Sequence, residues 1–229
     1  MQKNIKVIIP AFNEENAVGK VVMELPKDWI SEVIVVNNNS TDSTSEKAAA
    51  AGATVLEEPL QGYGRACLKG IEYLKNCGDT PDIVVFIDAD YSDYPNELPL
   101  LVSPIVNQNI DMVIGSRELG NREVGSMTVP QIFGNWLATT LIRLFYGVRY
   151  TDLGPFRAIK YDALIALDMQ DKTYGWTVEM QVKAAKQKMK TTEVAVNYKK
   201  RIGDSKISGT IKGTILAGYK IITTIFKYA

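Results

Sequence analysis

Histidine is absent from this 229-residue sequence, so acid–base chemistry would fall to carboxylates, lysine, tyrosine or the substrate itself. Cysteine is scarce, because Cys67 and Cys77 alone are too few for a disulfide scaffold, and this favours a reducing cytoplasm. The formal net charge is zero, since 26 basic residues balance 26 acidic ones. Without a basic field, nothing in the composition indicates a nucleic-acid partner.

Long apolar runs are missing too. No run reaches the roughly 18 residues of a membrane span, and a strand expected close to the N-terminus leaves no room for a signal peptide. The 46% of hydrophobic residues is ordinary for a globular protein with a sizeable core. We therefore expect one α/β domain over residues 1–209, followed by a helix at 210–229.

In the first half, apolar segments typical of strands alternate with segments typical of helices. The expected strands are 6–10, 32–36, 53–56, 83–87 and 112–114, and the expected helices are 14–25 (capped by Asn13), 41–51 and 66–75. This alternation predicts a mostly parallel sheet flanked by helices, in which the strands end at one common edge. Polar clusters follow four strands at that edge: Asn13 and Glu14, 37–42, 88–90, and Ser116 with Arg117.

The apolar strand at 83–87 ends in two carboxylates, Asp88 and Asp90. Taken alone, that spacing is explained better by a strand cap and a turn. Two hard oxygen donors at a strand's carboxyl end also suit Mg²⁺ or Mn²⁺, which takes one or two protein carboxylates together with substrate phosphates. The neighbouring polar strand ends favour the metal site.

The second half is less regular. A helix expected at 130–146 carries a broad apolar stripe, which favours core packing, with a lipid-facing groove as the alternative. Further strands are expected at 154–159 and 193–198, with a helix at 178–188 between them.

The segment 207–228 has a helical period, with apolar residues on one side and lysines on the other. Such a helix either docks on the domain with its lysines in solvent or lies in a membrane interface. The pattern alone leaves both possibilities open.

Ordered motifs along the chain carry a family resemblance. They include Pro-Ala-Phe-Asn-Glu at 10–14, Asn-Asn-Asn-Ser-Thr-Asp-Ser-Thr at 37–44, Asp-Ala-Asp at 88–90, Gly-Ser-Arg at 115–117, Asp-Leu-Gly-Pro-Phe-Arg at 152–157 and Arg-Ile-Gly-Asp-Ser-Lys at 201–206. The chain resembles the family-2 inverting glycosyltransferases with the GT-A (Rossmann-like) fold, and within them the polyprenyl- or dolichyl-phosphate sugar synthases. The resemblance extends to about residue 209 and implies a catalytic domain over 1–209.

The resemblance implies roles for individual residues. The implied contacts to the nucleotide sugar are Pro10, Ala11, Phe12, Glu14, Asn38, Gly64, Asp88 and Ala89. The implied ligands of Mg²⁺ or Mn²⁺ are Asp88 and Asp90. The implied phosphate-binding residues are Arg117, Arg157, Arg201, Ser205 and Lys206. The implied catalytic residues are Asp90, Asp152 and Glu179. Asn37 and Asn38 replace the aspartate pair of the family's loop, which leaves the choice of nucleotide open.

The implied reaction moves a hexose from a UDP- or GDP-sugar to a polyprenyl or dolichyl phosphate at the cytoplasmic membrane face. A metal ion and basic side chains would stabilise the leaving diphosphate, and attack from the opposite side inverts the anomeric carbon. A phosphate acceptor is already anionic and requires no strong base. A hydroxyl acceptor would instead require Asp152 or Glu179 as the base.

Other functions stay open at this point. The acceptor could be a soluble or glycolipid hydroxyl, and a sugar-nucleotidyltransferase would share the sheet and the metal. The latter normally has a glycine-rich basic loop where this chain has Ala11, Phe12, Asn13 and Glu14. Asn37 and Asn38 suggest a nucleotide-sugar-binding scaffold without turnover. A lipid acceptor predicts peripheral membrane contact, either through the C-terminal helix or through a membrane-protein partner.

Overall fold

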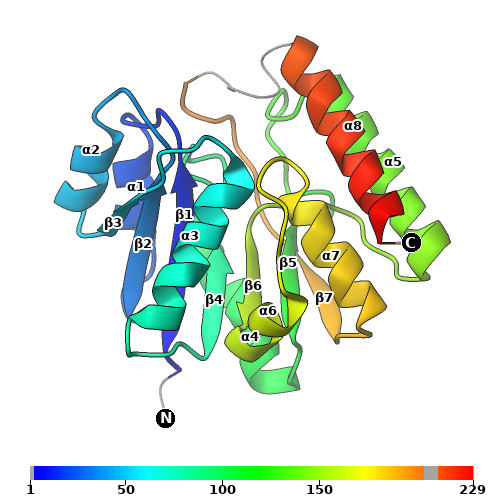
Figure 1. Ribbon diagram of the computed structural model, residues 1–229, viewed down its shortest axis with the longest axis horizontal. Helices are drawn as coiled ribbons and strands as arrows, with labels where there is room; N and C mark the ends of the chain where they lie inside the picture. The colour runs from blue at the N-terminus through cyan, green and yellow to red at the C-terminus, as the bar shows by residue number, and fades with distance from the viewer. Residues whose placement is uncertain (1–2, 204–210, 229) are drawn as a thin grey trace.

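The computed structural model describes residues 3–203 and 211–228. In these two ranges, a seven-stranded sheet lies between helices on both faces (Figure 1). The strands are β1 (Ile5–Ala11), β2 (Glu32–Asn37), β3 (Thr54–Glu57), β4 (Ile83–Phe86), β5 (Met112–Ser116), β6 (Arg157–Lys160) and β7 (Thr191–Ala195). Their order in the sheet is β3-β2-β1-β4-β6-β5-β7.

The sheet is parallel except at β6, which runs antiparallel to β4 and β5. The predicted mostly parallel α/β sheet is therefore confirmed, and the reversed strand is the feature that the sequence pattern did not indicate. Every residue of β1 and of β4 is buried. Helices cover both faces of these central strands, which explains why β4, and β1 from Val7 onward, are continuous apolar runs without alternation.

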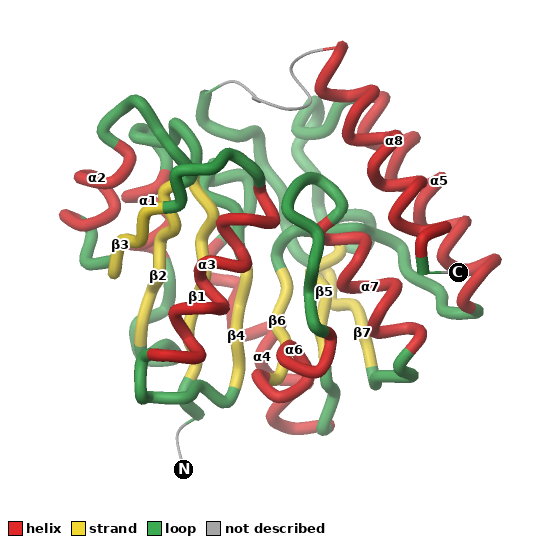
Figure 2. The backbone as a smooth tube through the Cα atoms, viewed as in Figure 1, coloured by secondary structure: helices red, strands yellow, loops and turns green. Residues whose placement is uncertain are grey.

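Two apolar cores lie on opposite faces of the sheet. One face is covered by α1 (Val18–Glu24), α2 (Thr44–Ala50), the short 3₁₀ turn η1 (Pro95–Glu97) and α4 (Leu98–Gln108). The other is covered by α3 (Tyr63–Asn76), α6 (Tyr161–Leu167) and α7 (Trp176–Lys186), with α5 (Val129–Tyr146) and α8 (Ile211–Lys227) at its outer end (Figure 2). Successive residues of β1 alternate between the cores: Ile8 enters one, and Val7 and Ile9 enter the other.

The first helix starts later than expected. It begins at Val18 rather than at residue 14, and no side chain caps it. Asn13 has a left-handed backbone, with φ 54°. Its side-chain oxygen accepts a hydrogen bond from the Thr41 backbone N–H at 2.8 Å. Asn13 therefore joins the loop after β1 to the loop after β2 instead of capping α1.

Helices α5 and α8, which are both largely apolar, lie side by side at one end of the molecule (Figure 1). Tyr146 of α5 donates a hydrogen bond to the Ile225 carbonyl of α8, and Tyr228, just after α8, donates to Glu179 of α7 at 2.7 Å. The C-terminal helix therefore packs on the domain. No helix in the described ranges combines the length and the apolar character that crossing a bilayer requires.

Candidate functional site

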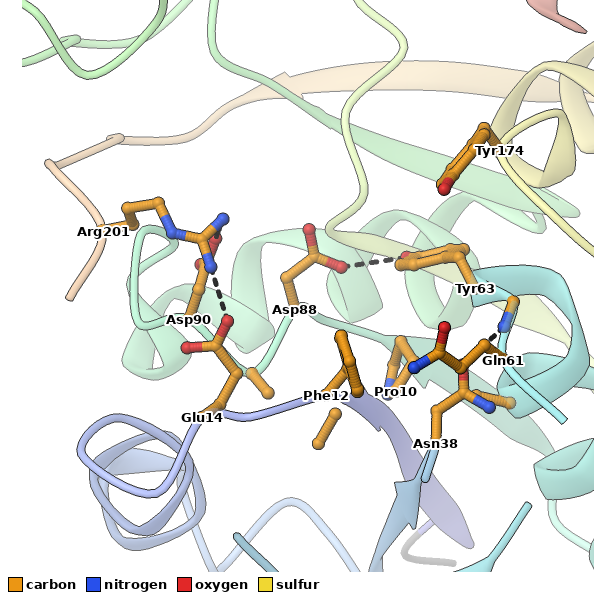
Figure 3. A pocket seen from close by; sticks show the side chains of 14 residues that line it. Pro10, Phe12, Glu14, Asn38, Gln61, Tyr63, Asp88, Asp90, Tyr174 and Arg201 are labelled. Carbon is orange, nitrogen blue, oxygen red and sulfur yellow. Dashed lines mark hydrogen bonds and ion pairs between the residues drawn. The ribbon is translucent and has the colours of Figure 1, made fainter. Parts of the chain in front are cut away.

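A pocket opens at the edge of the sheet where β1, β2 and β4 end (Figure 3). Because these strands are parallel, the residues that follow each of them meet there. The pocket is lined by Pro10, Ala11, Phe12, Glu14, Asn38, Gln61, Gly62, Tyr63, Ala66, Asp88, Ala89, Asp90, Tyr174 and Arg201. The structure thus brings together most of the residues for which nucleotide-sugar contact was predicted, together with Asp90 and Arg201.

The two carboxylates after β4 sit at the centre of this pocket. Asp88 accepts a hydrogen bond from the Tyr63 hydroxyl at 2.9 Å, and Asp90 accepts from the Ser92 backbone N–H at 3.0 Å. Burial, and next the charge of Asp90, raise the pKa of Asp88 to about 7. Asp88 and Asp90 therefore place negative charge in a partly buried pocket, where binding of a cation would be favourable.

The donor set fits a hard divalent cation bound partly by its substrate. Among residues 3–203 and 211–228, no group of three or more Asp, Glu, His or Cys side chains is arranged to hold a metal ion. Three carboxylates line the pocket, Glu14, Asp88 and Asp90, and the last two have a single residue between them. Mg²⁺ typically takes one or two protein carboxylates and completes its octahedron with phosphates and water.

Arg201 enters the pocket from the segment after β7. Its guanidinium pairs with Glu14 and, at 3.1 Å, with Asp90, and the Ile202 backbone N–H bonds to the Asp90 carbonyl at 3.0 Å. Arg201 is therefore the cation that offsets the acids of the pocket in the described structure. Ser205 and Lys206, for which phosphate binding was predicted, lie outside the described residues.

The end of β2 explains why asparagine stands at position 38. The Asn38 amide donates to the Leu60 carbonyl at 2.8 Å and to the Glu58 carbonyl at 3.3 Å, and its oxygen accepts from the Gly62 N–H at 2.7 Å. An aspartate has no N–H and could make only the last of these bonds. Asn38 therefore holds the 58–62 segment against the pocket.

Asn37, the preceding residue, is held in a similar way. Its amide donates to Glu57 at 2.8 Å, and its oxygen accepts from the Ser40 N–H at 3.0 Å. An aspartate at this position would place its charge beside the carboxylate of Glu57. The departure from the family's aspartate pair thus follows from local hydrogen bonding.

Arg117 and Asp152 form an ion pair beside the pocket rather than in its lining. Two nitrogens of the guanidinium contact the two carboxylate oxygens, each at 2.7 Å, and the Arg117 backbone N–H donates at 2.8 Å. Burial opposes ionisation of Asp152, but the Arg117 charge and these hydrogen bonds outweigh it and hold the pKa of Asp152 below its usual range. Asp152 is thus an ionised, fully paired group.

Arg157 and Glu179 are fully buried and bonded to the protein itself. The Arg157 guanidinium donates to backbone carbonyls of 153, 154 and 177, and burial lowers the pKa of Arg157 to about 10. Glu179 accepts from two backbone N–H groups and from Tyr228, and it pairs with Lys183 at 2.8 Å. Neither side chain lines the pocket; their predicted roles in phosphate binding and catalysis stay predictions.

Gly64 shapes the pocket without lining it. A Cβ at this position would overlap the Asp171 carbonyl oxygen, so only glycine allows the 171–174 segment to pack here. The Gly64 N–H also donates to the Thr173 carbonyl at 3.2 Å. This close approach brings Tyr174 to the pocket wall.

Five lining residues were not among the site residues predicted from the sequence, namely Gln61, Gly62, Tyr63, Ala66 and Tyr174. Tyr63 and Ala66 flank Gly64, for which a nucleotide contact was predicted, so that position could have pointed to them. Tyr174 comes from a loop more than 80 residues after Asp88, and no pattern around it indicates a site.

The sheet and the pocket at its carboxyl edge, with paired acids, are the arrangement expected of a glycosyltransferase with the GT-A fold. The sequence model of the family described as "Glycosyl transferase family 2" matches residues 6–167, and the chain belongs to this family of glycosyltransferases. An uncharacterized glycosyltransferase of Mycobacterium tuberculosis is 33% identical over 216 residues, which cover 93% of this chain and 94% of the relative.

Two more relatives have names that state an acceptor. An undecaprenyl-phosphate mannosyltransferase of Micrococcus luteus is 31% identical over 157 residues, which cover 66% of this chain and 63% of that protein. A dolichyl-phosphate hexose transferase of Haloferax volcanii is 29% identical over 209 residues, which cover 89% and 86%.

A solved structure shares the fold. Glucosyl-3-phosphoglycerate synthase of Mycobacterium tuberculosis, in complex with Mn²⁺, UDP and glucosyl-3-phosphoglycerate, superposes with a TM-score of 0.77 at 21% identity. The match covers 99% of this chain and 80% of that one. It confirms the predicted GT-A architecture.

Proposed function

We propose that this chain transfers a hexosyl group from a UDP- or GDP-sugar to a polyprenyl or dolichyl phosphate at the cytoplasmic membrane face, with inversion at the anomeric carbon. The ion pairs and hydrogen bonds of the carboxylates that line the pocket support a phosphate as the acceptor. Glu14 and Asp90 pair with Arg201, and Asp88 accepts from Tyr63. A phosphate acceptor supplies its own anionic oxygen and so needs no protein base.

The candidate bases for a hydroxyl acceptor are arranged in a way that supports the same choice. Asp152 is bound at both oxygens by Arg117, and Glu179 accepts hydrogen bonds from two backbone N–H groups of the segment before α7 and from Tyr228. Taking a proton from a hydroxyl would require breaking these bonds in a buried setting, which is costly.

The donor would lie across the ends of β1, β2 and β4. Both N–H groups of Asn38 are committed to backbone carbonyls, whereas its oxygen accepts only one bond. Asn38 can therefore accept from a base N–H, such as uracil N3 or guanine N1, but cannot donate to a base. Pro10, Ala11 and Phe12 would form the wall beneath the nucleoside.

Charge compensation at the diphosphate would come from both sides of the pocket. Asp88 and Asp90 would hold Mg²⁺ or Mn²⁺, which supplies Lewis-acid stabilisation of the leaving group. Arg201 lies against Asp90 and is positioned to contact phosphate. Ser205 and Lys206 follow it closely in the sequence and are proposed as further phosphate contacts.

Two relatives named for undecaprenyl phosphate and dolichyl phosphate support a lipid phosphate acceptor. A soluble acceptor is the second candidate, because the structural neighbour named above was crystallised with glucosyl-3-phosphoglycerate. A scaffold without turnover is disfavoured by the acids that the pocket retains.

The test is a transfer assay with UDP- and GDP-sugars and Mn²⁺, supplied with a short polyprenyl phosphate, the matching polyprenol or 3-phosphoglycerate. We expect a product only with the polyprenyl phosphate, and an inverted anomeric configuration by NMR. The polyprenol is the matched control, because it keeps the tail and removes the phosphate. Transfer to the polyprenol or to 3-phosphoglycerate would replace the proposed acceptor, and donor binding without transfer to any of the three would support the scaffold instead.

A further inference from the structure

The outer side of α5 exposes a stripe of large apolar side chains. Phe133, Trp136 and Leu144 are 59%, 58% and 73% exposed. At about 100° per residue they fall within one arc of the helix. The sequence stripe favours core packing, but the structure turns two of its members, Trp136 and Leu144, and the neighbouring Phe133 away from the core. Isolated exposed apolar residues are common, whereas a contiguous set of this size marks an interaction site.

Helix α8 continues this stripe. Its side chains Leu216, Tyr219 and Phe226 are exposed, and Phe226 stacks edge-on against Phe145 of α5 with ring centroids 5.0 Å apart. The two helices run side by side at the end of the molecule (Figure 1). We call the exposed apolar side chains Phe133, Trp136, Leu144, Leu216, Tyr219 and Phe226 the α5–α8 face.

The charges on these two helices all have one sign. Neither α5 nor α8 contains an aspartate or glutamate, although the whole chain has equal numbers of acids and bases. Arg143 and Lys227 are exposed near the carboxyl ends of the helices, and Lys220 pairs with Asp171 at 2.9 Å. Cations around an apolar, aromatic surface are the combination that attracts an anionic bilayer.

We propose that the α5–α8 face binds an anionic membrane surface, with Phe133 and Trp136 entering the headgroup region. Tryptophan and tyrosine suit that depth, because each joins an apolar ring to a polar group. A second copy of the chain is the rival occupant. A twofold interface formed by these two helices would bring together cations of both copies, Arg143 and Lys227, with no acid on either helix to pair with them. The membrane offers the missing negative charge.

The proposal stands independently of the acceptor, because vesicle binding is measured without a donor or turnover. The full chain is floated with vesicles of phosphatidylcholine, with or without phosphatidylglycerol, at low and high salt. We expect flotation with the anionic vesicles that weakens as salt rises. Phe133→Ser/Trp136→Ser should weaken it at least roughly tenfold.

Matched controls separate membrane binding from a general loss of apolar surface. Met23 on α1 is 61% exposed, so Met23→Ser removes exposed apolar surface elsewhere and should float like the wild type. Arg143→Gln/Lys227→Gln should weaken binding to anionic vesicles by roughly tenfold and leave neutral vesicles unaffected. Unchanged circular dichroism and Tm would show that the variants are folded.

Trp136 itself provides a second measurement. In a Trp29→Phe background, Trp176 is buried and Trp136 is exposed, so quenching by brominated lipid reports chiefly on Trp136. Wild-type protein that floats with neither vesicle would overturn the proposal, as would Phe133→Ser/Trp136→Ser binding at wild-type strength. A dimer that this double variant dissolves, without vesicle binding, would assign the face to a second copy instead.

Discussion

Replacing Asn38 with aspartate tests whether this residue positions the pocket or reads the nucleotide base. The substitution changes the size of the side chain little. It removes both N–H donors, so the carbonyls of Glu58 and Leu60 each lose a partner, and it sets a carboxylate beside them. The bond from the Gly62 N–H survives, because a carboxylate can still accept it.

The magnitude follows from those two bonds. Each hydrogen bond contributes about 0.5–1.5 kcal/mol net, so Asn38→Asp should lower the free energy of unfolding by about 2 kcal/mol. For a chain of this length, that corresponds to a fall in Tm of roughly 4–8 °C. The 58–62 segment would also loosen, so affinity should fall for UDP and GDP alike.

Denaturant unfolding and calorimetric titration with both nucleotides measure these effects. Asn39→Asp is the matched control, because Asn39 is the next residue, is exposed and receives the same charge. It should leave stability and affinity nearly unchanged. If Asn38→Asp is as stable as the wild type and binds one nucleotide more tightly, Asn38 reads the base and the positioning argument is wrong.

Further predictions address the metal, the glycine contact and pH. Asp90→Asn should abolish Mn²⁺ binding measured by calorimetry and lower transfer by roughly a hundredfold, while Glu46→Gln, an exposed acid, should do neither. Gly64→Ala should cost about 1–3 kcal/mol in denaturant unfolding, because its Cβ meets the Asp171 carbonyl, whereas Gly134→Ala in open space should not destabilise. Burial opposes ionisation of Glu32, but hydrogen bonds led by Lys6 lower its pKa in the folded state. Stability should therefore fall with the pH below about 4.5, and Glu32→Gln should flatten that fall.

Local pattern predicted the strands that build the pocket. Parallel strands buried on both faces are rich in apolar residues, so 6–10, 32–36 and 83–87 were identifiable even though Lys6 and Glu32 begin two of them. The rule that parallel strands end together placed their polar residues at one edge. The same pattern could not predict that β6 runs antiparallel to its neighbours. Its four residues, Arg157–Lys160, contain no periodicity that separates parallel from antiparallel pairing.

The other features that the sequence did not predict depend on contacts between segments that are distant along the chain. Tyr174 reaches the pocket because Gly64 leaves room for the 171–174 segment, and such a match between two loops is invisible in the sequence of either loop. The stripe on α5 was expected to pack on the core, and Leu141 does so, whereas Trp136 and Leu144 face outward. Hydrophobic periodicity identifies an apolar face, but only the position of the helix at the end of the sheet shows that the face carrying Trp136 lies outside.

The contacts of α8 also decide how the α5–α8 face has to be tested. Lys220 pairs with Asp171, and the same carboxylate accepts from the Thr173 and Gly175 backbone N–H groups. Those bonds shape the segment that carries Tyr174 into the pocket. Deleting α8 would therefore disturb donor binding together with any membrane contact. Surface substitutions such as Trp136→Ser leave these bonds in place, so they separate the two roles of this end of the molecule.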